Sequence, residues 1–468
     1  MTKKTKFDPN IIYGLFGTVG LSLFYQWLSI PLIDDWLIYT LQYTPDVNSA
    51  IQAALTTNTS SVFLPLDFGG GRYVWATTTF IPIYGLFEFM SPTVLFLCLS
   101  SLMVATLYLS GYFITASVRF ATTLGFIAAL STFNTYVFVY GTLMTLYLLV
   151  IYICIVTICL ISYFRASIHS KRWFVAFCLS ALLIIFGGEF WLNLAIPFLI
   201  ASGFIFFWAR KHNNLLMSQR ILRVSIFIIS ALFVYMTIRL QFTSSYKQAG
   251  FESEMVYTNT SLLLMFEDMA VNYFTYLHMT LSSLFPGFLT FSPSYVALGP
   301  ETILAEQHGY HADASQYIIS SHLSSWRFVA GALALGFFAL GWRWIKVAWN
   351  STNPETLVPV VLFAVVALGF LIYIPVKMRP ITFTAMLAYK ATISTVGLMV
   401  LVAWLIKISD QWKISPLFRN IVIVLTFTSV TIAAFTRPVT QSSGLEAVGL
   451  AGVSNPLKNV RHKLTGQK

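Results

Sequence analysis

This sequence is poor in charged residues. Only 10% of its 468 residues are charged, whereas an average soluble domain carries roughly 25%. So few charges cannot cover a soluble surface, but a surface that faces lipid excludes ions and needs none. The scarcity of charge therefore excludes a soluble globular enzyme and predicts an integral membrane protein.

Cysteine is also scarce, and acidic residues are outnumbered. The four cysteines (Cys98, Cys154, Cys159 and Cys178) lie in apolar runs without a C-x-x-C motif, so we expect neither a disulfide nor a zinc site. Lysine and arginine exceed acids by 28 to 17. Because these cations form short clusters between apolar runs, they predict cytoplasmic loops and not a nucleic-acid-binding stripe.

Apolar residues are abundant, at 57% with a mean hydropathy of +0.75. A spanning helix needs about 20 of them in succession. We predict an all-α integral membrane protein with about 11 transmembrane helices. The first span follows the basic stretch MTKKTKFDPN and is expected to be uncleaved. The candidate spans are 11–33, 93–117, 121–137, 139–163, 173–188, 190–209, 222–241, 327–343, 356–376, 382–406 and 417–435.

The basic residues orient these spans. With the N-terminus inside, the inner loops hold 16 of the 28 lysines and arginines, as the positive-inside rule requires. These loops are short, and we expect them to offer only generic cations. Two long segments, 34–92 and 242–326, then lie outside. We predict a single transmembrane domain over 1–436 and a short basic tail over 437–468, which the odd span count places outside.

Both outer segments contain apolar stretches. Residues 73–91 could form a span, but that would place the basic FRASIHSKRW (164–173) outside, against the charge rule. Residues 261–291 contain acidic side chains that disfavour a lipid-facing helix. We predict interfacial helices in both loops.

Two polar motifs mark the first outer loop. Asp34 and Asp35 stand side by side where the first span ends. Adjacent acids can simply mark a membrane edge, but their mutual repulsion can also raise one pKa towards that of a general base. The same loop ends in LDFGGGR. A glycine run before Arg72 is typical of a hinge or of a phosphate cradle.

Further cations lie on the outer side against the charge rule. Lys377 and Arg379 follow a predicted span, and Lys390 lies inside the next apolar run. Binding of an anion would explain their position, and contact with lipid head groups is the alternative.

Other outer candidates are polar turn and loop residues. Glu189 in FGGEFWLN is either a turn residue or a contact for a sugar hydroxyl or a metal. His308, His311, His322 and Arg327 precede a predicted span and are interpreted as a loop that caps the acceptor or sugar. Metal binding by His308, His311 and Asp313 is the weaker alternative, because H-x-x-H-x-D in a polar loop is not diagnostic.

The layout over 1–436 resembles the GT-C-type glycosyltransferases. The shared features are an acid pair after the first span, a long outer loop with interfacial helices, and a second large outer loop in the later half. The acid pair with Gly71-Arg72 is most similar to bacterial members related to serotype-converting glucosyltransferases. The pair here is Asp-Asp and no large soluble C-terminal domain follows, which departs from many members.

The resemblance implies a polyprenyl-phosphate-linked sugar as donor and a glycan, lipid or protein as acceptor. Asp34 or Asp35 would be the base of an inverting transfer. From their location, Arg72, Lys377, Arg379 and Lys390 would stabilise the leaving phosphate. The family includes metal-dependent and metal-independent members, so no cofactor is firmly expected and a divalent metal stays open. We expect a bacterial inner membrane, with the site facing the periplasm or exterior.

Two other readings fit parts of the sequence. O-antigen polymerases and ligases also have a large outer loop with arginines and histidines, which 242–326 could supply. A transporter or flippase would predict charged or broken spans at the bilayer midplane in paired halves. Only Lys390 points that way. A purely structural assembly subunit is the remaining alternative.

Overall fold

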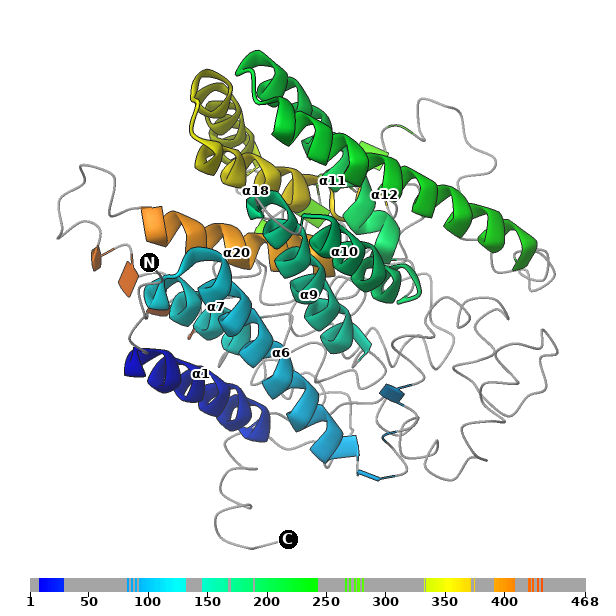
Figure 1. Ribbon diagram of the computed structural model, residues 1–468. Coiled ribbons are helices and arrows are strands. Elements are labelled where there is room, and N and C mark those ends of the chain that lie inside the picture. Colours follow the sequence, from blue (N-terminus) through cyan, green and yellow to red (C-terminus); the bar gives the residue numbers. More distant parts are fainter. Residues whose placement is uncertain are drawn as a thin grey trace, which may run out of the picture.

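The computed structural model describes about half of the chain, in separated stretches (Figure 1). Within these stretches the secondary structure is helical and contains no strand. The described residues are 8–28, 82–83, 86, 89–90, 92–131, 145–166, 170–187, 190–242, 266, 269–270, 273–274, 276–277, 280–281, 332, 334–371, 374, 391–408, 420–421, 423–424, 427–428 and 431.

Each described helix of ten or more residues overlaps one predicted span, although the ends differ by several residues. Proline opens α1 and α6, where its missing N–H costs no helical hydrogen bond. The elements are α1 (Pro9–Leu28), α6 (Pro92–Thr115), α7 (Val118–Leu130), α9 (Thr145–Arg165), α10 (Ser170–Ile185), α11 (Phe190–Lys211), α12 (Leu215–Phe242), helix 334–350, η4 (Pro354–Thr356), α18 (Leu357–Leu368) and α20 (Thr392–Ile408).

Four of these helices are long and apolar enough to cross a membrane: Val94–Thr115, Leu146–Arg165, Trp191–Lys211 and Leu215–Thr237. At 1.5 Å per residue each reaches about 30 Å, the thickness of the hydrocarbon core. Shorter apolar helices cover Pro9–Phe24, Val118–Leu130, Pro354–Leu368 and Thr392–Ile408. The chain is therefore an α-helical membrane protein, while the total of eleven spans stays a prediction.

Several helices start earlier than their predicted spans, and α7 shows a clear cause. The expected span was 121–137, but α7 begins at Val118 because Ser117 caps it, accepting from the backbone N–H of Phe120 at 3.2 Å. Ala116 makes the turn from α6 with a φ of 50°. Two residues thus suffice to reverse the chain, and Arg119 lies in the first turn of α7 and not in a loop.

Side-chain contacts fix the direction of α1. The hydroxyls of Ser22 and Ser100 lie 3.1 Å apart, whereas a Cβ on Gly14 would meet the hydroxyl of Tyr108. Later residues of α6 therefore face earlier residues of α1, so the two helices run antiparallel. The intervening segment 29–91 must begin and end on the same side of the membrane, as the placement of 34–92 in one outer loop requires.

Contacts between helix ends show which ends of the other helices lie on the same side of the bundle. Arg165, at the end of α9, donates a hydrogen bond to the carbonyl of Ile114 near the end of α6. Trp208, near the end of α11, donates to the carbonyl of Ala348 near the end of helix 334–350. Phe120 at the start of α7 packs edge-on against Trp404 near the end of α20. One end of the bundle, which we call the inner end, thus gathers the N-terminus of α1 and these turns.

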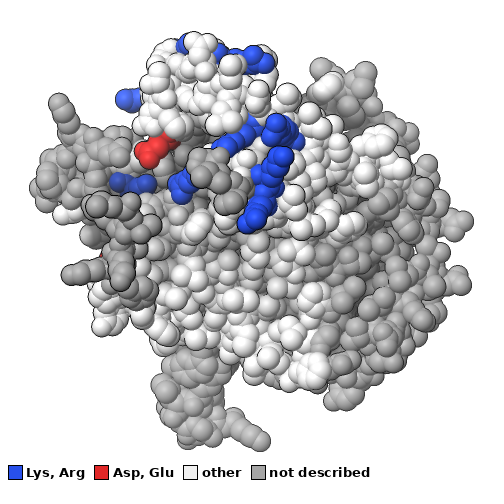
Figure 2. All heavy atoms as spheres, viewed as in Figure 1, with Lys and Arg blue, Asp and Glu red and all other residues white. Residues whose placement is uncertain are grey.

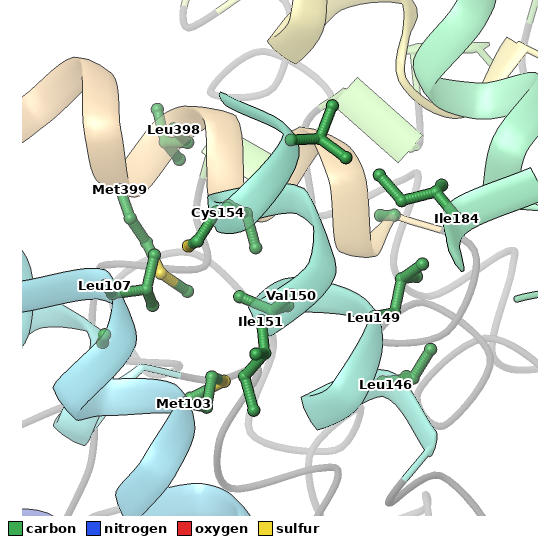
Figure 3. Close-up of a cluster of buried hydrophobic side chains, with 14 of the residues drawn as sticks. Met103, Leu107, Leu146, Leu149, Val150, Ile151, Cys154, Ile184, Leu398 and Met399 are labelled. Carbon is green, nitrogen blue, oxygen red and sulfur yellow. The ribbon is translucent and has the colours of Figure 1, made fainter. Parts of the chain in front are cut away.

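The core lies between α6, α9, α10 and α20 (Figure 3). Met103 and Leu107 of α6 point towards Val150 and Cys154 of α9, with Met399 of α20 closing the cluster. Apolar side chains also cover the outside: on α12, Ile226, Ile229 and Phe233 are exposed. Helices that are apolar on all sides fit a bilayer and not water.

Candidate functional site

Every residue predicted for catalysis or binding lies outside the described residues, so their roles stay predictions. They are Asp34, Asp35, Arg72, Glu189, His308, His311, His322, Arg327, Lys377, Arg379 and Lys390. The structure does describe helix ends that adjoin several of them. Leu28 ends α1 before the acid pair, Phe190 opens α11 directly after Glu189, and Ala391 precedes α20 directly after Lys390. All three ends lie opposite the inner end, at what we call the outer end.

The inner end carries the positive charge. Figure 2 shows the lysines and arginines gathered over one part of the surface. Among residues whose side chains are described, the cations are Arg119, Arg165, Lys171, Arg172, Arg210, Lys211, Arg220, Arg223, Arg343, Lys346 and Lys407. Each lies in the inner part of its helix. Their clustering at this end agrees with the orientation predicted from the charge rule.

Several inner cations hold specific positions, which corrects the expectation that they are generic. Arg220 of α12 is buried and donates to the carbonyls of Phe164 (2.7 Å) and Ala166 (2.5 Å) at the end of α9. Arg165 donates to Ile114 in the last turn of α6 at 2.6 Å. The last carbonyls of a helix lack partners and carry partial negative charge. These arginines therefore act as caps supplied by a neighbouring helix.

The C-terminus of helix 334–350 is capped in the same way from α11. The indole N–H of Trp208 reaches the carbonyls of Ala348 (2.8 Å) and Ser351 (3.0 Å). The ammonium of Lys211 donates to the carbonyl of Trp349 at 2.9 Å and lies 4.7 Å from the centre of its ring. These contacts join α11 to a helix more than a hundred residues later, and they give the inner end a structural role.

The outer end holds a cluster of aromatic residues. Tyr273 and Tyr276, from the second outer segment, pack on Phe370 just after α18, with ring centroids 5.5 and 5.4 Å apart. Tyr273 also stacks on Phe338 of helix 334–350. Burial raises the pKa of both phenols. Phe266 and Phe274 of the same segment are exposed, so its described positions form one buried and one exposed face.

Part of the first outer segment also reaches the core. Ile83 is 3% exposed and belongs to the main core cluster, and Leu86 packs against that cluster. Phe89 is exposed. The backbone N–H of Met90 bonds to the carbonyl of Leu86 at 2.9 Å. These described positions of 73–91 therefore combine buried and exposed apolar side chains just before α6.

Unpaired polar groups occur at the start of α11. The amide nitrogen and oxygen of Asn193 and the indole nitrogen of Trp191 are buried and have no hydrogen-bond partner in the part of the chain that the structure describes. Each such group costs about 1–3 kcal/mol if it stays unpaired. Sequence reasoning selected Glu189 in this motif and missed Asn193. The sequence feature that could have identified Asn193 is an amide within an apolar run, four positions before Pro197.

The part of the chain that the structure describes contains no cluster of three or more potential metal ligands. His308, His311 and Asp313 lie outside it, so the metal alternative stays open. Comparison with known protein families, curated proteins and solved structures finds no match for this chain.

Proposed function

We propose that this protein is a membrane glycosyltransferase of the GT-C type, which transfers a sugar from a polyprenyl-phosphate donor at the outer end. The direction of α1 carries the proposal. Its N-terminus lies at the basic inner end, and its C-terminus at the outer end shortly before Asp34 and Asp35. The acid pair therefore follows a helix that rises towards the side where the predicted site residues gather.

The division between the two ends supports the same proposal. At the inner end, several described cations, among them Arg165, Lys211 and Arg220, bind helix carbonyls or aromatic rings, so these already have structural partners. At the outer end, helix termini adjoin Glu189 and Lys390, and α11 begins with the buried polar groups of Trp191 and Asn193, which have no partner among the described residues. Such groups also occur elsewhere, for example at Tyr163 near the inner end. A buried polar group without a partner requires an explanation, and contact with a substrate is one.

In the proposed reaction, Asp34 or Asp35 removes the proton of the acceptor hydroxyl. The hydroxyl oxygen attacks the anomeric carbon from the side opposite the phosphate, the bond from carbon to phosphate oxygen breaks, and polyprenyl phosphate leaves. Arg72, Lys377, Arg379 and Lys390 would stabilise the charge that develops on this phosphate. The donor enters from the bilayer, where its lipid chain remains.

Substitution of the acid pair tests the proposal. Asp34→Asn, Asp35→Asn and the double variant are expressed in cells, and sugar transferred to the envelope is quantified by mass spectrometry. Loss of a general base is expected to lower transfer about 10²–10⁴-fold in at least one single variant. Asp46→Asn, in the same loop, is the control. Full transfer by the double variant at normal protein levels would contradict the proposal, and flux of labelled sugar lipid across proteoliposomes without transfer would favour a flippase.

A further inference from the structure

The first two turns of α11 contain a concentration of unpaired hydrogen-bonding groups. Asn193 is 0% exposed, yet neither its amide nitrogen nor its amide oxygen has a partner. Trp191 is 3% exposed, and its indole N–H is also unpaired. Pro197 lies inside the same helix. Because proline has no N–H, the backbone carbonyl of Asn193 lacks the partner it would have in a regular helix.

These groups face an environment in which water is scarce. In lipid, each polar group must be satisfied inside the protein, and exceptions line a cavity or contact a ligand. The surroundings are apolar: Ala195 is buried, and both it and Trp191 belong to the main core cluster. If this amide only filled space, a leucine in its place would make the fold more stable. The described part of the chain offers the amide no partner, and a bound ligand can supply one.

We propose that the start of α11 binds a neutral, hydroxyl-bearing group, which on the function proposed above is the sugar ring of the donor. The site offers donors, from the indole and the amide, and acceptors, from the amide and the Asn193 carbonyl. None of these groups is charged. A sugar hydroxyl both donates and accepts and can satisfy them, whereas a lipid tail would leave them unpaired and an ionised phosphate has no proton to donate to the amide oxygen.

The position of the two side chains sets how the ligand lies. Side chains two residues apart leave a helix on different sides. A ligand that contacts both Trp191 and Asn193 therefore reaches across the N-terminal end of α11, where the first backbone N–H groups also have no helical partner. This end follows Glu189 directly in the sequence. The site would thus lie beside the residue that sequence reasoning assigned to sugar binding.

Binding to the purified protein in nanodiscs tests the inference. The probes are undecaprenyl phosphate carrying glucose, galactose or mannose, each compared with bare undecaprenyl phosphate. The wild-type protein is expected to bind the best sugar lipid about tenfold more tightly than the bare lipid. Asn193→Leu and Trp191→Phe should each reduce this preference while leaving the Kd of the bare lipid unchanged. Ser202→Ala removes another buried, unpaired hydroxyl deeper in α11 and should keep the preference.

Thermal stability provides a second measurement. Without ligand, Asn193→Leu should raise the Tm, because it removes an unpaired amide. A lower Tm would show that the amide already has a partner within the fold, and it would overturn the inference. Equal affinity of wild type for all four lipids would also overturn it and would leave ordered water as the occupant.

The outcomes separate this site from the proposed reaction. The Asp34→Asn/Asp35→Asn double variant should lose transfer and keep its preference for the sugar lipid. If the wild-type protein prefers the sugar lipid but transfers no sugar, the proposed function is contradicted and the binding site is supported. Undiminished sugar transfer by Asn193→Leu would contradict the proposed binding site but not the proposed function.

Discussion

The guanidinium of Arg220 in α12 donates a 2.7 Å hydrogen bond to the carbonyl oxygen of Phe164 at the end of α9. Its second terminal nitrogen donates to the carbonyl of Ala166, and its Cζ atom lies 5.4 Å from the centre of the Tyr163 ring. One buried side chain from another helix therefore closes the last turn of α9. The basic residue that the charge rule places inside thus also has a packing role.

Replacing Arg220 is expected to destabilise the bundle. Arg220→Leu leaves two helix-terminal carbonyls unpaired at a buried position and should lower the free energy of unfolding by about 2–3 kcal/mol. The change in the free energy of unfolding is measured by circular dichroism during unfolding in a denaturing detergent. Arg223→Leu is the matched control, because Arg223 is exposed on the same helix; its effect should stay within about 0.5 kcal/mol. Equal effects of the two substitutions would show that the cap contributes nothing specific.

The indole of Trp208 should be as important for its N–H as for its ring. Trp208→Phe keeps an aromatic side chain but removes the donor shared by the carbonyls of Ala348 and Ser351. We expect a loss of about 1–2 kcal/mol, measured by the same unfolding assay. Trp342→Phe, on an exposed side chain of helix 334–350, should have little effect. A harmless Trp208→Phe would mean that water replaces the lost donor.

Composition and charge predicted much of the architecture. Hydropathy located the helices because a bilayer requires long apolar segments with internally paired backbones. The distribution of cations predicted which ends meet, and contacts such as Arg165 with Ile114 agree with that order. Helix boundaries were less predictable. The start of α7 depends on the Ser117 cap and the two-residue turn before it, which average hydropathy does not register.

Specific contacts escaped prediction for a different reason. The caps by Arg220 and Trp208 join residues far apart in the chain, so no local pattern reveals them. Asn193 was overlooked because a single amide in an apolar run barely alters hydropathy, although its burial without a partner is informative. The acid pair was found from its local sequence and its place after α1. Its geometry lies outside the described residues and its role stays a prediction.

The contact between α18 and α20 depends on a glycine. A Cβ at Gly369 would lie 2.6 Å from the hydroxyl of Ser394 and 3.0 Å from its backbone nitrogen. Gly369→Ala should therefore force the two helices apart and cost about 1–3 kcal/mol. Gly203 in α11 has nothing within 4 Å of the corresponding position, so Gly203→Ala should stabilise the protein by about 0.5–1 kcal/mol. Thermal unfolding measures both variants. Opposite shifts in Tm would show that the effect at Gly369 comes from close packing and not from alanine itself.

The orientation of the bundle can be tested by thiol labelling. Thr352 is exposed in the turn before η4, at the inner end, whereas Asn48 belongs to the predicted first outer loop. Asn48→Cys should react with a membrane-impermeant maleimide in intact cells, and Thr352→Cys only after the membrane is opened. The wild-type protein measures the background, which should be low because its free cysteines lie on the apolar helices α6, α9 and α10. Labelling of Thr352→Cys in intact cells would reverse the orientation, place the basic end outside, and remove the basis for an outward-facing acid pair.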